Sequence, residues 1–350
     1  MDLRGVLVVE DAINGRTAHG GRVPATEHVG NRPIAHHVLD ALKSAGVRRV
    51  VVASSARSAG AVRECLAPRE DSGLAFQFVE SAAPLELSSA LSLAAPVVDA
   101  DPCIVHVAGG LLAEPLVPMA QALNEGADAV VTLHRSPAPD QQLSPVTRRM
   151  LDLEDSDAPG SALGVAGVWG FGPGALRHAA TGPRAQPEPP TEMARRIAAQ
   201  NGRICARLAR AWSAYRGEAG ELLELNQIVL DGVMGDLARA GDEGNQVEGR
   251  VSIDASASVR NSVLVGPIVI GPGVQIRDAY IGPYTAIGAG AWIEGAEVER
   301  SIIGAGATLT HVGTRVTASV VGRNARVFRD FSLPRALRLN VGEGNEVGLC

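Results

Sequence analysis

The first two thirds of the chain alternate short apolar runs with longer segments that have the apolar spacing of helices. Residues 5–9 read GVLVV, residues 103–107 read CIVHV, and residues 32–46 read RPIAHHVLDALKSAG. Runs that are apolar at every position are typical of parallel strands covered by helices on both faces. The pattern therefore predicts an α/β domain built from βαβ units, which we place at residues 1–242.

From about residue 246 the periodicity changes. Aliphatic residues now recur every five or six positions, and glycine often follows them, as in VLVGPIVIGPGVQI at 263–276. The series consists of Val247, Ile253, Val259, Leu264, Ile270, Ile276, Ile281, Ile287, Ile293, Val298, Ile303 and Leu309, then, after a small irregularity, Val316, Val321 and Val327. This spacing fits neither a helix nor an amphipathic strand. It fits a parallel β-helix of hexapeptide-type repeats, in which each short strand points one aliphatic residue into a triangular core. We place this second domain at residues 243–350.

Composition narrows the functional classes. The 350 residues are 46% hydrophobic and 20% charged, as expected for two globular domains. A formal net charge of −6 and only 3% aromatic residues argue against nucleic acid as a partner. No stretch is long and apolar enough to span a membrane, and the four cysteines lack metal-site spacing. We expect a cytoplasmic protein with reduced thiols that binds neither membranes nor nucleic acid.

Several segments carry a resemblance to a known family. They are VEGRVSIDASASVRNSVLVGPIVIGPGVQIRDAYIGPYTAIG at 247–288, RLNVGEGNEV at 338–347, NRPI at 31–34, GVAGVWGFGP at 164–173 and ELLELN at 221–226. Together they resemble the sugar-1-phosphate nucleotidylyltransferases, and most of all the long type of glucose-1-phosphate thymidylyltransferase. The resemblance implies a Rossmann-like nucleotidyltransferase domain followed by a left-handed parallel β-helix. It also implies a reaction in which a sugar 1-phosphate attacks a nucleoside triphosphate and pyrophosphate leaves.

The phosphate loop of that family is altered here. The reaction needs backbone N–H groups and cations around the phosphates, and Mg²⁺ held by aspartates. The family's loop reads like G-G-x-G-T-R, and the matching positions are Asp11, Ala12, Ile13, Asn14, Gly15 and Arg16. Arg16 keeps the family's residue, whereas Glu10 and Asp11 bring negative charge. Each acid would repel a phosphate charge about 4 Å away by about 4 kcal/mol.

Other family positions also lack their expected groups. The lysine of a PKP segment falls near Pro24, and Glu86 takes a glycine position in the nucleobase segment P-x-G-L-A. The two Mg²⁺ aspartates fall on Gly109 and, with Trp212 aligned, on Ala214. Neither glycine nor alanine offers the oxygen ligand that Mg²⁺ requires.

The family's sugar-binding EKP element is also altered. It keeps its acid as Glu154 but has Asp155 in place of lysine.

Two enzyme alternatives stay open. A shifted register in the first half would leave an active nucleotidylyltransferase, with metal ligands drawn from Asp99, Asp101, Asp128 or Glu218. An acyltransferase is the second alternative, because β-helices of this kind also host acyltransferases with a histidine base. His311 is the only histidine after residue 240.

The combined loss of cations, glycines and metal ligands predicts a non-catalytic homologue. Such a protein would serve as a ligand sensor, a scaffold or a regulatory partner of an active relative. We predict no cofactor, with Mg²⁺ bound only if the enzyme alternative holds. The apolar β-helix segments predict a homo-oligomer, and the other expected partners are an active homologue or a ligand similar to a sugar nucleotide.

Overall fold

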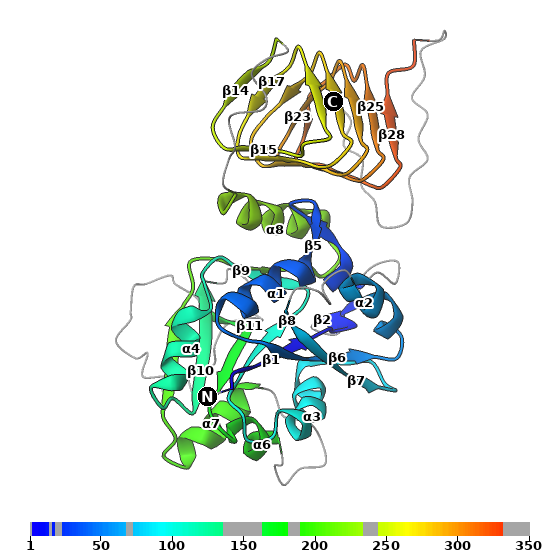
Figure 1. The fold of residues 1–350 in the computed structure, drawn as a ribbon. Helices are drawn as coiled ribbons and strands as arrows, with labels where there is room; N and C mark the ends of the chain where they lie inside the picture. Colours follow the sequence, from blue (N-terminus) through cyan, green and yellow to red (C-terminus); the bar gives the residue numbers. More distant parts are fainter. Residues whose placement is uncertain are drawn as a thin grey trace. The chain divides into compact units, whose positions relative to one another are not determined.

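The computed structural model describes residues 2–13, 16–17, 23–67, 73–135, 163–180, 190–233 and 244–331 (Figure 1). The chain packs as two compact units, one formed by 1–27 with 33–216 and the other by 28–32 with 217–350. The predicted boundary after residue 242 follows the change in sequence period, whereas packing assigns 217–242 to the second unit. No helix in the described part of the chain is long and apolar enough to cross a membrane.

A seven-stranded sheet forms the centre of the first unit, in the order β12-β10-β11-β8-β1-β6-β7. Its strands are β1 (Arg4–Val8), β6 (Arg49–Ser55), β7 (Ala75–Ser81), β8 (Cys103–Val107), β10 (Ala129–Arg135), β11 (Leu163–Phe171) and β12 (Ile204–Leu208). All pairings are parallel except those of β11, which runs antiparallel to β8 and β10. Because β6 and β8 flank β1 on opposite sides, the strand order reverses at β1. Ligand sites in such sheets lie beyond the carboxyl ends of the strands at this point.

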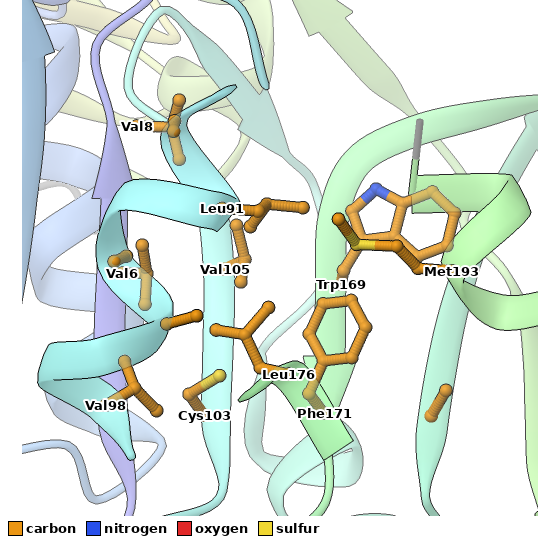
Figure 2. Close-up of a cluster of buried hydrophobic side chains, with 14 of the residues drawn as sticks. Val6, Val8, Leu91, Val98, Cys103, Val105, Trp169, Phe171, Leu176 and Met193 are labelled. Carbon is orange, nitrogen blue, oxygen red and sulfur yellow. The ribbon is translucent and has the colours of Figure 1, made fainter. Parts of the chain in front are cut away.

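Helices cover both faces of the sheet, as the apolar strands predict. The described helices of this unit are α1 (Ile34–Ser44), α2 (Ala59–Leu66), α3 (Leu87–Val98), α4 (Val117–Asn124), α6 (Ala175–Ala180) and α7 (Pro190–Ala199). On one face, α3, α6 and α7 enclose a core in which Trp169 and Phe171 of β11 lie with Met193 (Figure 2). On the other face, Leu42 of α1 packs against Gly5 of β1.

The second unit contains three parallel sheets of five described strands each. The first has β14 (Gln246–Glu248), β17 (Val263–Val265), β20 (Tyr280–Ile281), β23 (Glu297–Glu299) and β26 (Val316–Thr317). The second has β15 (Val251–Ile253), β18 (Ile268–Ile270), β21 (Thr285–Ile287), β24 (Ile302–Ile303) and β27 (Val320–Val321). The third has β16 (Ser258–Arg260), β19 (Gln275–Arg277), β22 (Trp292–Glu294), β25 (Thr308–Thr310) and β28 (Arg326–Phe328).

These sheets form the predicted parallel β-helix. In the first coils, paired residues such as Val247, Leu264 and Ile281 are 17 positions apart, which is the length of one coil. The aliphatic series lines the interior, where Ile276 and Ile287 are 0% exposed. The α/β domain followed by a parallel β-helix is therefore confirmed.

The second unit also contains α8 (Ala219–Asp231) and residues 28–32 from the hairpin of β4 (His28–Val29) and β5 (Arg32–Pro33). Asn226 of α8 is 1% exposed. Its side chain connects α8 and residues 28–32 to the β-helix. Its Oδ1 accepts from the Gly30 N–H at 2.9 Å, and its Nδ2 donates to the Tyr284 carbonyl at 3.0 Å. Asn31 Nδ2 donates to the Ile287 carbonyl at 2.7 Å. One buried amide thus fixes the helix and the hairpin segment on the coil.

Candidate functional site

The candidate site lies beyond the carboxyl ends of β1, β6 and β8, where the strand order reverses. Glu10 and Asp11 follow β1, Ser55 ends β6, and Gly109 follows β8. The segment that enters α3 lies against the same edge, because the Asp11 N–H donates to the Leu85 carbonyl at 3.3 Å. The sheet thus brings four segments that are distant in sequence to one place.

Asp11 uses both carboxylate oxygens within the protein. Its Oδ1 accepts from the Ser55 hydroxyl at 2.8 Å, and its Oδ2 accepts from the Leu85 N–H at 2.8 Å. Hydrogen bonds to a charged acceptor contribute roughly 1.5–3 kcal/mol each. The carboxylate therefore bridges β1, β6 and the segment before α3, and it occupies a backbone donor at this edge.

Glu10 makes a similar contact at the start of α3. Its Oε1 accepts from the N–H of Leu87, the first residue of the helix, at 3.1 Å. A helix N-terminus favours an anion because its first N–H groups have no partner within the helix. Here the Glu10 carboxyl of the protein itself takes that position.

The surroundings of Glu10 raise its pKa to about 7. Burial is the main cause, the Leu87 hydrogen bond lowers the pKa, the Glu86 carboxylate raises it and Arg216 lowers it. The pKa of His134 is lowered mainly by burial, and the positive charge of Arg216 lowers it further. Among the described residues, the charges that shift the pKa of Glu10 are therefore the Glu86 carboxylate and the Arg216 guanidinium, so positive charge is not in excess around it.

Gly109 has no room for a side chain. A Cβ built on it would lie 2.7 Å from the Cβ of Pro24, which is buried in the short 3-10 turn η2 (Pro24–Thr26). Carbon atoms in packed interiors do not approach this closely, so a side chain at 109 would force the turn or the loop after β8 to move. The positions that the resemblance assigns to a metal-binding aspartate and a phosphate-binding lysine thus pack against each other.

Ala214 lies beside Gly109. The strand β13 (Trp212–Ala214) pairs antiparallel with β9 (Gly110–Leu112), which places Ala214 opposite Gly110. The N–H of Tyr215 donates to the Gly109 carbonyl at 2.9 Å. The two positions assigned to metal ligands are therefore neighbours in space, although neither has a side-chain oxygen.

The indole of Trp212 fills the space above two glycines. A Cβ on Gly110 would lie 2.4 Å from the Trp212 Cη2, and one on Gly167 would lie 2.9 Å from its Cζ2. The His106 ring lies beside the indole, with ring centroids 5.7 Å apart. Burial lowers the pKa of His106 to about 4, and its Nδ1–H donates to the Val107 carbonyl at 2.8 Å. At neutral pH this imidazole is uncharged and supplies no cation.

The two positions that the resemblance assigns to metal ligands do not fit a magnesium ion. Mg²⁺ requires oxygen ligands in near-octahedral geometry. Gly109 and Ala214 have no side-chain oxygen, and each carboxylate oxygen of the nearby Asp11 already accepts one hydrogen bond from the protein. Nowhere in the described ranges do three or more His, Cys, Asp or Glu side chains gather as a possible metal site.

The acids named for a shifted register lie elsewhere. Asp101 precedes β8 and pairs with Arg4 at 2.7 Å, and Asp128 precedes β10, so both lie at the amino-terminal edge of the sheet. Asp99 follows α3 at its carboxyl end and forms an ion pair there. Glu218 belongs to the second unit, where it precedes α8. Asp99, Asp101 and Asp128, the acids named for the first metal position, are therefore not at the edge where Gly109 lies.

The remaining predicted site residues fall partly outside the described residues. In the predicted phosphate loop, β2 (Ala12–Ile13) pairs with β3 (Arg16–Thr17) as a short hairpin. The side chains of Ala12 and Arg16 are outside the described part, as are Asn14, Gly15 and Glu154.

The other two predicted positions are on the surface. Glu86 is exposed at the N-cap of α3, where its backbone needs no glycine (φ −106°). His311 is exposed on a corner of the β-helix, and its ring lies edge-on to Phe331, with centroids 6.4 Å apart.

Sequence reasoning missed Ser55 and Arg216 as members of this edge. Neither residue belongs to a recognised motif. Ser55 joins the site because β6 lies beside β1, and Arg216 joins it through the segment that follows β13. Their only sequence signal is position, because Ser55 ends an apolar strand and Arg216 follows the aligned Trp212 by four residues.

Comparison with known proteins identifies relatives along nearly the whole chain. No protein-family model matches it. The chain is 27% identical over 328 residues to a glucose-1-phosphate thymidylyltransferase of Streptomyces antibioticus, covering 91% of each chain. It is 28% identical over 324 residues to the Streptomyces griseus protein of the same name, covering 90% of each.

A third relative and a solved structure extend this result. The third relative is the low-salt glycan biosynthesis nucleotidyltransferase Agl11 of Haloferax volcanii, which is 25% identical over 369 residues. The alignment covers 99% of this chain and 100% of the Agl11 chain. A crystal structure from Bacillus anthracis, described as a glucose-1-phosphate thymidylyltransferase with sucrose, superposes with a TM-score of 0.52. The superposition covers 67% of this chain and 98% of the Bacillus anthracis chain, at 14% sequence identity. This similarity shows a shared fold.

Proposed function

The chain is a homologue of the sugar-1-phosphate nucleotidyltransferases, and we propose that it no longer transfers nucleotides and instead serves as a non-catalytic sensor, scaffold or regulatory partner. The observation that carries this proposal is the contact between Gly109 and Pro24. A metal-binding aspartate cannot occupy position 109 without displacing the turn at Pro24, since even a Cβ would lie 2.7 Å from the proline. The loss of the carboxylate is therefore accompanied by packing that closes its space.

The carboxylates of Asp11 and Glu10 support the same proposal. They accept hydrogen bonds from the N–H groups of Leu85 and Leu87, donors at the edge where ligands of such sheets bind. An incoming triphosphate would have to displace one or both carboxylates before reaching those donors. It would then face the Asp11 carboxylate and the partly ionised Glu10 carboxyl where the family's reaction needs cations and Mg²⁺.

A pyrophosphate-release assay tests the proposal. The protein is incubated with glucose 1-phosphate, each common nucleoside triphosphate in turn, and Mg²⁺, with the Streptomyces antibioticus relative as positive control. We expect release at the background rate with every triphosphate. Turnover in the usual enzyme range of ~1–10³ s⁻¹ would contradict the proposal.

The relatives' names favour one second candidate, an active glucose-1-phosphate thymidylyltransferase that joins a nucleoside triphosphate to glucose 1-phosphate. This alternative needs metal ligands other than residues 109 and 214, which have no side-chain oxygen. The same assay decides between the two, and chelation with EDTA should then abolish turnover. Acyl transfer, the third alternative, rests on His311, which is exposed and lies beside Phe331.

A thermal-shift screen separates a sensor from a scaffold. A ligand at a concentration of 100 times its Kd stabilises the folded protein by about 2.7 kcal/mol and so raises its melting temperature. A scaffold that binds none of the compounds should keep its melting temperature. Sugar nucleotides are the first compounds to screen, because they are the products of the homologous reaction.

We also propose self-association through the β-helix. The outward-facing residues Val263 and Val265 of β17 are partly exposed, so this strand presents two apolar side chains on its outer face. Light scattering should give a multiple of the 36.2 kDa chain mass, and Val265→Lys should lower it. A monomer at micromolar concentration would contradict this part of the proposal.

A further inference from the structure

The three outer faces of the β-helix differ in what lies against them. The second sheet is covered by parts of its own unit, since α8 contacts β27 and residues 28–32 contact β18 and β21. Asn31 Nδ2, for example, donates to the carbonyls of Val269 at 3.3 Å and Ile287 at 2.7 Å. On the first and third sheets, by contrast, every outward side chain of a described strand is exposed or partly exposed.

The outer surface of the first sheet, the first face, combines apolar and acidic side chains. The outward residues of its strands are Gln246, Glu248, Val263, Val265, Tyr280, Glu297, Glu299 and Thr317. Glu297 and Glu299 share a single cation, Arg315, at 2.9 and 3.3 Å. Three carboxylates and one guanidinium therefore lie on this face, and its net charge is negative.

The outer surface of the third sheet, the third face, has the opposite charge. The outward residues of its strands are Ser258, Arg260, Gln275, Arg277, Trp292, Glu294, Thr308, Thr310, Arg326 and Phe328. Three guanidinium groups and one carboxylate make it positive. It also carries aromatic rings, because Phe328 is 56% exposed and the guanidinium carbon of Arg277 lies 5.3 Å from the centre of the Trp292 ring.

The two faces match coil by coil. If two copies are related by rotation about an axis parallel to the β-helix, each coil lies level with the same coil of its neighbour. In the first coil Glu248 of one copy then faces Arg260 of the next, and in the third coil Tyr280 faces Trp292. In the fourth coil the two acids of the first face lie opposite threonine hydroxyls, which can donate hydrogen bonds to them.

A contact of either face with itself lacks this match. With the coils level, each charged residue would face its own copy, so that Arg260 would oppose Arg260. With the β-helices running in opposite directions, the first coil would meet the fifth, and Arg260 would oppose Arg326. On the first face, the acids of the fourth coil would then meet Val263 and Val265 of the second. Like charges set against each other across an interface cost several kcal/mol.

We propose that the first face of one copy packs against the third face of a second copy, with the two β-helix axes parallel. This inference rests on the self-association proposed above and adds which surfaces meet. Opposite net charge favours the pairing, and the rings of Tyr280 and Trp292 supply apolar contact at its centre. Because the two faces differ, each copy can bind one neighbour through each face, and the contact repeats until a ring closes.

Light scattering of the full-length protein, with one variant for each face, tests this inference. Val265→Lys blocks the first face by setting a cation opposite Arg277, and Trp292→Lys blocks the third face by removing the ring opposite Tyr280. Each variant alone should fall from the parent's mass to 36.2 kDa. An equimolar mixture should give twice that mass, because each variant contributes the face that the other has lost. Gln227→Lys adds the same charge on α8, outside both faces, and should keep the parent's mass.

A contact of one face with itself gives a different result, since only one of the two variants would dissociate and the mixture would form no mixed dimer. Either variant alone remaining above the monomer mass overturns the inference, and so does a mixture that stays monomeric. A monomeric parent overturns the proposed self-association as well, so the two failures are distinguishable. Melting temperatures check the folding of both variants. If either melts below the parent, Val263→Lys and Thr308→Lys, at partly exposed positions of the same two faces, take their place with the same outcomes.

Discussion

At the scale of single residues, the contact between Gly109 and Pro24 gives a prediction about stability. Gly109→Ala adds a Cβ 2.7 Å from that of Pro24 and should lower the free energy of unfolding by about 1–3 kcal/mol, the usual cost of overpacking. Gly60→Ala is the matched control, because its Cβ would meet nothing within 4 Å and the position lies in α2. Urea unfolding should show the control unchanged or stabilised by about 0.5–1 kcal/mol. Equal stability of the two variants would refute the close packing at Gly109.

Glu10 gives a second prediction, concerning pH. Burial raises its pKa from 4.5 to about 7, so its contribution to stability is fully present below pH 4.5 and is lost as the pH rises through 7. Glu10→Gln keeps the Oε1 acceptor and removes the titration. The free energy of unfolding of this variant, relative to the parent, should therefore increase by about 3 kcal/mol between pH 4.5 and 7.5.

Urea unfolding across this pH range measures the effect. Glu248→Gln, at an exposed position of β14, is the control and should run parallel to the parent. Parallel profiles for Glu10→Gln would show that the carboxyl at position 10 is hydrated rather than buried.

At the scale of elements, Asn226 holds α8 and residues 28–32 on the β-helix. Asn226→Ala removes both the acceptor for Gly30 and the donor for Tyr284, leaving two polar backbone groups unpaired. We expect a loss of about 2–4 kcal/mol in the free energy of unfolding of this unit. Gln227→Ala, one residue further along α8 and exposed, should change it by less than about 0.5 kcal/mol. Similar effects from both variants would contradict the bridging role of Asn226.

The elements also show what sequence can and cannot predict. Fully apolar strands and the recurring aliphatic positions are local signals, and the folded elements confirm the fold class that they predict, an α/β sheet followed by a parallel β-helix. The bond from Ser55 to Asp11 has no local signal, because it depends on β6 lying beside β1. The closeness of Pro24 and Gly109 is likewise a property of tertiary packing. The sequence shows which residues stand at these positions, but not which residues pack against them.

At the scale of the whole molecule, the chain combines an α/β sheet with a parallel β-helix. The alignments to its curated relatives span 90–99% of the chain. At the edge of the large sheet, the carboxyl groups of Asp11 and Glu10 accept hydrogen bonds from backbone N–H groups of the same edge. We therefore expect ligand binding to have moved away from triphosphates.

Calorimetric titration with nucleoside triphosphates, in the presence and absence of Mg²⁺, tests this central claim most directly. Binding of a magnesium triphosphate precedes any nucleotidyl transfer, so the result does not depend on finding the right sugar. The account predicts no magnesium-dependent binding with a Kd below about 1 mM for any common triphosphate. Saturable binding in the micromolar range that disappears when Mg²⁺ is removed would contradict it.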